Sequence, residues 1–290
     1  MKKTLFLFLT CLFFFRTFGQ VSNGKVNSLV AAENYFSGMA GRKGIKKAFL
    51  QVSDENTLIF RPGPVNAQKY FKDQAPDNGQ LSWEPVWAKI SKSGDWGFTT
   101  GPYIYRSAEN PEQAYYGEYV SVWKMNSKGI WKLAIDIGMS HPKPLAQPKL
   151  LFVDPTSSRY YLPRSKARLQ QREDVILTSD KLLSAVLEQY KVNAYHAFFT
   201  DEARLLFPGF EPLIGKEKIT NFLQAQQFQI STEPLAANRA HGSDLAYTYG
   251  TASITQKGIT KPYHYVRIWE IQDNADWNVI LEIFSPAKSN

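Results

Sequence analysis

Three side chains with acid–base chemistry stand in or beside expected strands. Asp136 lies within an apolar run, and Glu84 and His141 each stand directly before a proline. A carboxylate or an imidazole can accept a proton from a substrate when a second group stabilises the negative charge that develops. Asp136, Glu84 and His141 are therefore the candidate catalytic residues.

Each of these candidates also has a purely structural interpretation. Apolar residues alternate with Asp136 along its run, so regular strand geometry turns the carboxylate away from the core. The acid would then face a second copy of the fold or a dimer partner. Glu84 and His141 would be ordinary residues of a strand start and a loop.

Arg61 and four aromatic residues are the candidate ligand contacts. Arg61 lies in the motif Arg-Pro-Gly-Pro, where its guanidinium would bind an anionic group or pair with a nearby acid. The aromatic residues would line an apolar cavity if their strands turn them inward, and core packing is the alternative. The acids available to Arg61 are Asp54, Glu55 and Glu84, and the aromatic candidates are Trp83, Tyr103, Tyr119 and Trp123.

The sequence has no pattern of a metal or phosphate site. Its four histidines never form His-x-His or His-x-x-x-His, and the only cysteine is Cys11. A glycine-rich phosphate loop, a Gly-x-Ser-x-Gly elbow and a Ser-His-Asp arrangement are also absent from the sequence. We therefore expect neither a cofactor nor a metal.

Residues 1–20 have the pattern of a secretory signal peptide. A basic pair precedes an apolar run from Leu5 to Phe15, which is too short to span a bilayer, and cleavage is expected after Gly19 or Gln20. Lipid anchoring at Cys11 is not expected, because the apolar run continues beyond it. The sequence predicts export to the periplasm or the exterior, without membrane association after cleavage.

Composition gives the protein an ordinary globular character. The chain has 290 residues, a net charge of +8, 43% hydrophobic and 21% charged residues, which suit one large or two medium domains. The predicted signal contains three of the positive charges and the only cysteine, so core burial rather than disulfides must stabilise the rest. No nucleic-acid-binding motif accompanies the basic residues, and nucleic acid is not an expected partner.

The chain contains one internal repeat at an offset of about 146–149 positions. Five segments of the first half match five of the second in the same order, as Ser53–Phe60 matches Thr200–Phe207 and Tyr119–Trp123 matches Tyr265–Trp269. Two long copies are too few for a solenoid, so we expect two domains of one fold.

The expected organisation follows from this repeat. The first domain covers 21–145, a basic, proline-containing linker covers 146–180, and a diverged second domain covers 181–290. Each copy is expected to begin with a helix, over 26–51 and 181–199, and to continue with a short strand, a short helix and a series of antiparallel strands. This order is typical of the α+β class.

The motifs of the first copy resemble the nuclear transport factor 2-like, or cystatin-like, superfamily, which includes ketosteroid isomerase-like and SnoaL-like proteins. They are most similar to exported SnoaL-like domains of unknown function. The second copy lacks the Arg-Pro-Gly-Pro run, and no Ser-His-Pro ends its last strand. The motifs are Phe60–Asn66, Leu81–Pro85, Ser93–Pro102 and Asp136–Pro142.

The resemblance implies two cone-shaped domains, each a curved antiparallel sheet wrapped around an N-terminal helix with an apolar pocket at one end. The aromatic share of 14% suits such curved sheets and pocket walls. Members of the superfamily include isomerases, dehydratases and domains that only bind or dimerise, so fold alone does not decide function.

Three functions are therefore compared. The leading hypothesis is an exported tandem SnoaL-like protein that binds a small, mostly apolar ligand in the first cone, with catalysis left open. The second is an isomerase- or dehydratase-type enzyme with Asp136, Glu84 or His141 as base and Tyr103 or Tyr119 as oxyanion donor. The third is a non-catalytic scaffold whose two domains pair through their sheet faces as a pseudo-dimer, or whose chains form a homodimer.

Overall fold

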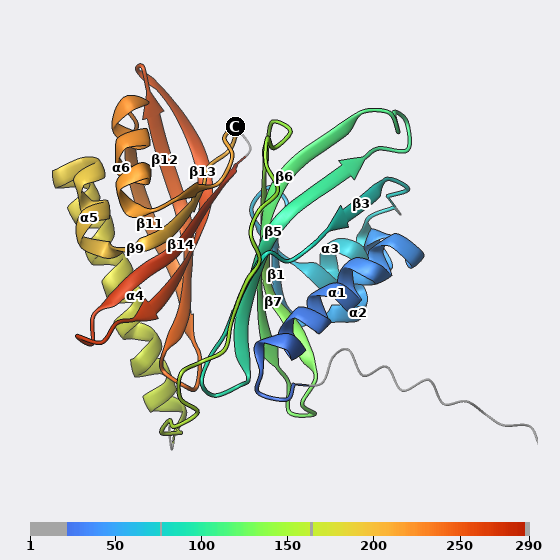
Figure 1. Cartoon of the computed structure of the whole chain (residues 1–290), viewed down its shortest axis with the longest axis horizontal. Helices are drawn as coiled ribbons and strands as arrows, with labels where there is room; N and C mark the ends of the chain where they lie inside the picture. Colours follow the sequence, from blue (N-terminus) through green and yellow to red (C-terminus); the bar gives the residue numbers. More distant parts are fainter. Residues whose placement is uncertain (1–21, 76, 163–164, 288–290) are drawn as a thin grey trace, which may run out of the picture.

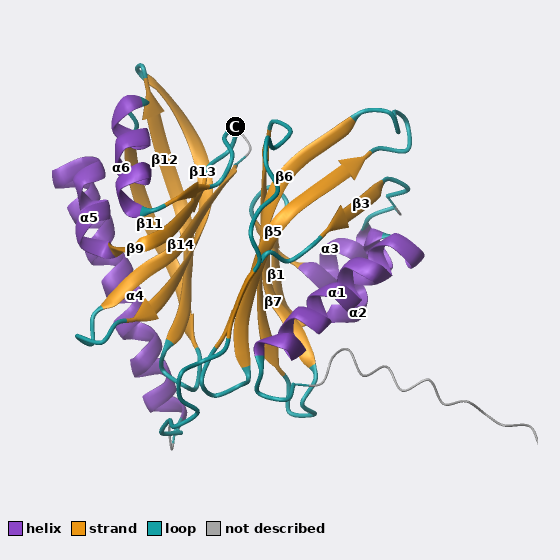
Figure 2. Ribbon diagram, in the orientation of Figure 1, coloured by secondary structure: helices purple, strands orange, loops and turns teal. Residues whose placement is uncertain are grey.

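Two curved sheets face each other, and each carries its helices on the side turned away from the other sheet (Figures 1 and 2). The computed structural model describes residues 22–75, 77–162 and 165–287. The expected signal peptide, residues 1–20, lies outside this part. Within the described residues, no helix is long and apolar enough to cross a membrane.

The first domain places its three helices before and beside an antiparallel meander. Its sheet has the order β2-β1-β7-β6-β5-β4, with β3 also paired to β5 and with β1 parallel to β7. The elements are α1 (Val26–Lys43), α2 (Ile45–Val52), β1 (Ser53–Phe60), β2 (Pro64–Asn66), α3 (Ala67–Asp73), β3 (Gln80–Trp83), β4 (Trp87–Ile90), β5 (Trp96–Arg106), β6 (Ala114–Met125) and β7 (Trp131–His141).

The second domain repeats this arrangement with the order β10-β9-β14-β13-β12-β11, and β9 is parallel to β14. The α+β class and the two cones are therefore confirmed. The elements are β8 (Leu151–Val153) in the connection, then α4 (Lys166–Tyr190), a 3-10 turn (Lys191–Asn193), α5 (Ala194–Phe198), β9 (Phe199–Leu206), β10 (Leu213–Ile214), α6 (Lys216–Ala225), β11 (Gln229–Arg239), β12 (Leu245–Gln256), β13 (Ile259–Ile271) and β14 (Trp277–Pro286).

The first expected helix, 26–51, is two helices because of Gly44. This residue has φ 85° and ψ 158°, a conformation that essentially only glycine adopts. The chain turns there, so that α1 and α2 pack against each other. Apolar residues continue at helical spacing on both sides of Gly44, so the sequence pattern did not reveal where α1 ends and α2 begins.

The expected linker, 146–180, is only partly a connection. β8 pairs in parallel with β4, and α4 begins at Lys166 rather than at residue 181. Ser165 caps the helix by accepting a hydrogen bond from the Arg168 amide. Ile176 and Asp180 are fully buried, so residues 166–180 belong structurally to the second domain.

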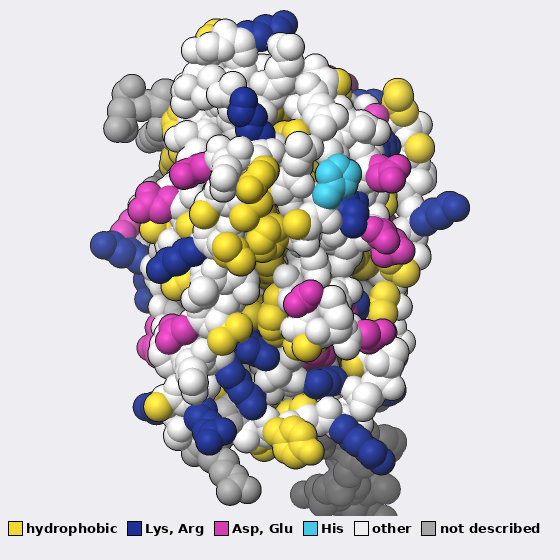
Figure 3. All heavy atoms as spheres, turned by 90° about the vertical axis from the view of Figure 1, so that its left-hand side faces the viewer, with side chains coloured by type: hydrophobic (Ala, Val, Ile, Leu, Met, Phe, Trp, Pro, Cys, Tyr) yellow, Lys and Arg dark blue, Asp and Glu magenta, His cyan; other side chains and the backbone are white. Residues whose placement is uncertain are grey.

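Helix α4 packs against β11 with a narrow face and leaves apolar residues on the outside. Val175, Leu182 and Tyr190 are each about half exposed. The molecular face that carries α4, α5 and α6 accordingly shows hydrophobic side chains among charged ones (Figure 3). Because of this mixed pattern, the predicted start of the helix at residue 181 is later than the observed start at Lys166.

Apolar residues form three clusters: one inside each cone and a third between the two sheets. In the third cluster, residues from β1 and β4–β7 of the first domain meet residues from β9 and β12–β14 of the second. Both faces of the central strands are therefore buried. The first-domain members of this layer include Phe60, Trp87, Phe98, Val120, Val122, Ile135 and Ile137, and the second-domain members include Leu206, Val266, Ile268, Leu281 and Ile283.

A β-bulge in each last strand reverses the direction of the side chains. Trp123 pairs with Leu133 but Val122 pairs with Ile135, so Ala134 is an extra residue in β7. Ile280 occupies the same position in β14. Beyond the bulge, the odd-numbered apolar residues of β7 face the other domain and the even-numbered residues face the cone.

Candidate functional site

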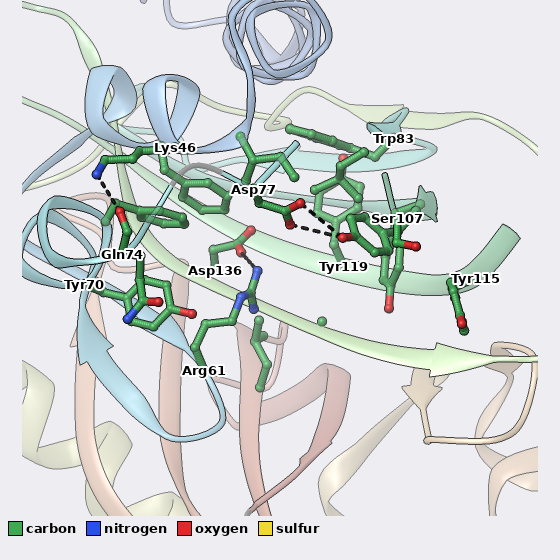
Figure 4. Close-up of a pocket in the computed structure, with 18 of the residues that line it drawn as sticks. Lys46, Arg61, Tyr70, Gln74, Asp77, Trp83, Ser107, Tyr115, Tyr119 and Asp136 are labelled. Atoms are coloured by element: carbon green, nitrogen blue, oxygen red, sulfur yellow. Dashed lines mark hydrogen bonds and ion pairs between the residues drawn. The ribbon is translucent and has the colours of Figure 1, made fainter. Parts of the chain in front are cut away.

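The first cone contains a cavity of about 830 Å³ between the sheet and the helices α1–α3 (Figure 4). Aromatic residues are the largest group in its wall, and its polar residues come from α2, the β1–β2 turn, the segment after α3, the β5–β6 connection and β7. These polar residues are Lys46, Arg61, Gln74, Asp77, Ser107, Glu109, Asp136 and Ser140. Such a volume and lining are typical of small-molecule sites. The aromatic wall consists of Phe36, Phe49, Tyr70, Phe71, Trp83, Tyr103, Tyr105, Tyr115 and Tyr119.

Asp136 lines this cavity, so the prediction that it faces outward was wrong. The bulge at Ala134 puts Ile135 and Ile137 between the sheets and turns Asp136 into the cone. The carboxylate is buried and accepts a hydrogen bond of 3.0 Å from the Ser121 hydroxyl. Burial raises its pKa, although Arg61 and Ser121 act in the opposite direction.

Arg61 reaches into the cavity from the turn between β1 and β2 (Figure 4). Its Nη2 lies 3.8 Å from Asp136 Oδ1, and its Nη1 donates to the Phe60 carbonyl at 2.8 Å. Asp136, rather than Asp54, Glu55 or Glu84, is thus its acidic neighbour. The side chain is 37% exposed, so a ligand can approach the guanidinium from the cavity side.

Three of the four aromatic candidates lie on the cavity wall. Trp83, Tyr103 and Tyr119 line it, whereas Trp123 is fully buried in the core and is not part of the lining. The Tyr103 hydroxyl lies 3.0 Å from Ser140 Oγ. Within the described residues the buried Tyr119 hydroxyl has no hydrogen-bond partner.

Glu33 on α1 is a buried acid that the sequence interpretation missed; it contacts the cavity-lining Trp83 but does not itself line the cavity. It is fully buried and accepts hydrogen bonds from Trp83 Nε1 at 2.5 Å, Thr99 Oγ1 at 2.5 Å and Trp123 Nε1 at 2.8 Å. Burial outweighs these three donors and raises its pKa to about 7. A signal was present, because Glu33 occupies one position of the helical apolar period that includes Leu29.

His141 and Glu84 lie outside the cavity. His141 faces the second domain, with Nδ1 2.6 Å from the Pro142 carbonyl and Nε2 3.7 Å from Glu118 Oε1. Burial lowers the pKa of His141, but Glu118 and the Pro142 carbonyl outweigh this effect and raise it above its usual value. Glu84 is exposed in the β3–β4 connection. Asp136 is therefore the one member of the catalytic trio on the cavity wall.

In the second cone, side chains occupy the corresponding space. Arg267 forms ion pairs with Asp180 and, at 2.6 Å from its Nε, with Glu282 Oε1. Tyr265 donates to Asp180 at 2.9 Å and Tyr195 to Glu282 at 2.8 Å. All five side chains are fully or almost fully buried, so this cone has a closed ionic network at its centre.

The repeat relates the two interiors residue by residue. Glu33 corresponds to Asp180, Asp136 to Glu282 and Tyr119 to Tyr265, whereas Ser121 stands where Arg267 stands in the second domain. The first cone therefore keeps both acids but has a small hydroxyl in place of the arginine.

The described residues contain no cluster of three or more histidine, cysteine, aspartate or glutamate side chains that could hold a metal ion. The polar side chains on the cavity wall are carboxylates, the Arg61 guanidinium, the Lys46 ammonium, the Gln74 amide and hydroxyls, and they stand beside aromatic rings.

Solved structures with similar folds cover about one domain length of the chain. A ketosteroid isomerase-like protein from Erwinia carotovora atroseptica is 14% identical, with a TM-score of 0.35 over 40% of this chain and 96% of that chain. A nuclear transport factor 2-like protein from Cytophaga hutchinsonii is 19% identical, with a TM-score of 0.34 over 39% and 97%. Neither a protein-family model nor a curated protein sequence matches the chain.

A third similar structure, an epoxide hydrolase from M. tuberculosis, is 11% identical, with a TM-score of 0.32 over 40% of this chain and 80% of that chain. Two of these structures are named as ketosteroid isomerase-like and nuclear transport factor 2-like proteins, the superfamily that the motifs of the first copy resemble. The activities in their names belong to those proteins, because proteins of one fold can have different functions.

Proposed function

We propose that the first domain binds a small, mostly apolar ligand and holds one polar or anionic group of it at Arg61, next to the buried Asp136. The observation that carries this proposal is an aromatic cavity of about 830 Å³ with a buried carboxylate and a partly exposed guanidinium on the same wall. Apolar rings would pack on the aromatic side chains, and the polar pair would fix their orientation. The arginine network of the second cone supports a non-equivalent role for the second domain.

Two fluorescent probes with the same rings test this proposal. N-phenyl-1-naphthylamine is uncharged, and 1-anilinonaphthalene-8-sulfonate carries one negative charge. Both are expected to bind the full-length protein, and the variant Gly138→Leu is expected to weaken both by at least about tenfold, since a leucine there fills the cavity. A Cβ at Gly138 meets only ordinary contacts, so the strand tolerates the change.

Gly41→Leu is the matched control, because nothing lies within 4 Å of a Cβ at this exposed helical position. It should bind both probes as the wild type does. Equal affinity of the wild type and Gly138→Leu for both probes would contradict a ligand site in this cavity.

A second candidate function is an isomerase- or dehydratase-type reaction. It is favoured by the buried Asp136 carboxylate in the same cavity as the unpartnered Tyr119 hydroxyl, which could donate to a developing oxyanion. The base would remove a carbon-bound proton, and the electron pair would move to an oxygen that Tyr119 stabilises. Glu84 and His141 have less support for this role, because neither lines the cavity.

The proton transfer can be tested with 5-nitrobenzisoxazole, whose ring opens with cleavage of its N–O bond when a base removes its C3 proton. Turnover that falls at least about hundredfold in Asp136→Asn supports a base at this position. Equal turnover by this variant and the wild type, or no turnover by either, would contradict the hypothesis that Asp136 is a catalytic base.

The apolar layer between the sheets supports the scaffold hypothesis, in which the two domains pair through their sheet faces. An internal pseudo-dimer and ligand binding are compatible, and Gly138→Leu separates them, because it changes the cavity and leaves that layer intact. A scaffold without a ligand would retain its assembly and show no probe binding.

Export remains part of the proposal and is supported by the sequence pattern of residues 1–20. N-terminal sequencing of the protein from a native cell fraction tests it. A mature N-terminus at residue 20 or 21 in an extracytoplasmic fraction is the expected result, and an intact Met1 in the cytoplasm would exclude export.

A further inference from the structure

The turn that carries Arg61 rests on the second domain. A Cβ added at Gly63, two residues after Arg61, would lie 3.0 Å from Nε2 of His264, so the imidazole is in direct contact with this turn. Phe60, the residue before Arg61, packs against His264 and Tyr249, with ring centroids 5.8 and 6.0 Å apart. Both sides of the arginine are thus supported by side chains of the other domain.

The opposite edge of the cavity also has a contact from the second domain. The Gly209 amide in the loop after β9 donates to the Ser140 carbonyl at 2.8 Å. Ser140 lines the cavity and its hydroxyl lies 3.0 Å from the Tyr103 hydroxyl. Two separate segments of the second domain therefore contact two separate segments of the cavity rim.

The position of the guanidinium depends on this support. The Arg61 guanidinium lies 3.8 Å from the Asp136 carboxylate, and its only hydrogen bond within the described residues is to the adjacent Phe60 carbonyl. Such a partly exposed side chain is held weakly by its own contacts, so the backbone of the turn determines where it points. The turn has one internal hydrogen bond, from the Arg61 amide to the Gly63 carbonyl at 2.9 Å.

We propose that the second domain positions the ligand site of the first, with His264 as a positioning residue that holds the Arg61 turn against the cavity. This inference rests on the proposed ligand-binding function. It gives a role to a domain whose own cone is occupied by the Arg267 network. The contact of Gly209 with Ser140 supports the Tyr103 side of the rim in the same way.

Four variants of the full-length protein test the role of His264. His264→Ala removes the ring, His264→Phe keeps a planar ring, Gly63→Ala introduces a methyl group at the contact, and the double variant Gly63→Ala/His264→Ala provides space for that methyl group. The affinity of 1-anilinonaphthalene-8-sulfonate is expected to fall on the order of tenfold in His264→Ala and Gly63→Ala and to stay near the wild-type value in His264→Phe. In the double variant the methyl group should cause no further loss.

His241→Ala is the matched control, because His241 is also an interdomain histidine but pairs with Asp95, at 2.5 Å, away from the cavity lining. It should lose interdomain contact without loss of probe affinity. Equal probe affinity in the wild type, His264→Ala and Gly63→Ala would overturn the inference.

A measurement without any ligand separates the two proposals. The pKa of the Asp136 carboxyl, followed by carbon NMR, should rise in Arg61→Gln, because Arg61 lowers it. His264→Ala should move it in the same direction and His241→Ala should leave it unchanged. A raised pKa with no probe binding to the wild type would reject the proposed function and support the positioning role, whereas an unchanged pKa would reject the positioning role.

Discussion

Two residue differences distinguish the cone with the ionic network from the cone with a cavity: Ser121 stands in place of Arg267, and Gly138 stands in place of the buried Phe284. The helix acid and the last-strand acid are present in both domains, and in the second domain Arg267 lies between them. Ser121 occupies the matching position in the first domain and only donates a hydrogen bond to Asp136. The first cone therefore has room for a ligand and retains two buried acids whose pKa values are raised.

Residue types alone identified part of this site. Arg61, Trp83, Tyr103, Tyr119 and Asp136 all lie on the cavity wall. Trp123 was predicted to line the cavity if its strand turned it inward; it does lie on the same cone-facing side of β6 as Tyr119, but it packs in the closed part of the cone against Glu33 and Phe36. Whether an aromatic side chain lies on the cavity wall or in the core therefore depends on its depth in the cone, which the residue type does not encode.

Glu33 should make stability depend on pH. Its folded-state pKa of about 7 lies above the usual 4.5, so the folded protein keeps a proton that the unfolded chain releases. The unfolding free energy therefore falls as pH rises from 4.5 to 7, by about 3 kcal/mol, and the contribution is level above this range. Urea unfolding of the wild type and Glu33→Gln at pH 5 and 8 should show that the variant lacks this part of the fall.

Other raised acids titrate in the same direction, but they are present in both proteins and cancel in the comparison. Parallel curves for the wild type and Glu33→Gln would show that Glu33 is ionised in both the folded and the unfolded states at pH 5.

Arg61→Gln should separate the two fluorescent probes. The neutral amide removes one of the two positive side chains of the cavity wall and leaves Lys46 and Asp136 in place, so the anionic sulfonate loses an attractive partner. Its dissociation constant should rise about tenfold, and that of the uncharged N-phenyl-1-naphthylamine should change by less than about twofold. Fluorescence titration measures both, and equal losses would indicate that Arg61 shapes the cavity rather than attracts charge.

Arg267→Met should destabilise the protein strongly and in a pH-dependent way. It leaves Asp180 and Glu282 as two buried carboxylates without their cation, which costs on the order of 3–5 kcal/mol. Protonation of the acids relieves this penalty, so the loss measured by urea unfolding should be larger at pH 8 than at pH 5. Lys257→Met, at an exposed turn, is the control for loss of a surface cation.

At the scale of elements, the strands show what period-2 alternation can and cannot predict. The order of helices and strands and the hairpin connections were predictable, because apolar runs and turn residues mark them. The direction of Asp136 was not, because one extra residue, Ala134, reverses the alternation in the middle of β7. A strand buried on both faces has no polar side to reveal such a reversal.

The helices gave two further differences of the same kind. Gly44 divides a continuous apolar period into α1 and α2, and α4 extends fifteen residues before the point where a clear period begins at residue 181. In both cases a single local residue, Gly44 with its special backbone conformation and Ser165 with its cap, decides where the helix ends or begins, and the apolar period does not show it.

Gly44→Ala should weaken both the fold and the ligand site. Its φ of 85° and ψ of 158° strain any residue with a Cβ, at a cost of about 1–3 kcal/mol. The strain falls on the junction that positions α2, which contributes Ile45 and Phe49 to the cavity wall. Urea unfolding should show the loss of stability, and titration with N-phenyl-1-naphthylamine should show a weaker complex.

Gly41→Ala is the matched control three residues away, since Gly41 lies inside α1 and has open space around its Cβ. This variant should be neutral or slightly stabilising, because alanine favours a helix over glycine. A loss of stability in Gly41→Ala equal to that in Gly44→Ala would remove the special role of the junction.

At the scale of the whole molecule, the apolar layer between the sheets joins the two domains into one folding unit. Val266 lies in this layer, is fully buried and pairs across the sheet with Tyr249 and Ile283. A carboxylate placed there would be buried in an apolar layer, so the layer must open or the group must take up a proton.

The wild type should accordingly unfold in urea in one transition that is the same by tryptophan fluorescence and circular dichroism. Val266→Asp should lower the unfolding free energy by several kcal/mol at pH 8 and so move the midpoint to lower urea. The same variant should separate the two signals, because the domains lose their mutual support. It should also weaken binding of 1-anilinonaphthalene-8-sulfonate, since His264 no longer holds the Arg61 turn. Val175→Asp, which adds the same charge at a half-exposed position of α4, should leave the single transition and the probe affinity unchanged. Retained probe affinity in Val266→Asp after the domains have separated would mean that the first domain forms its site alone.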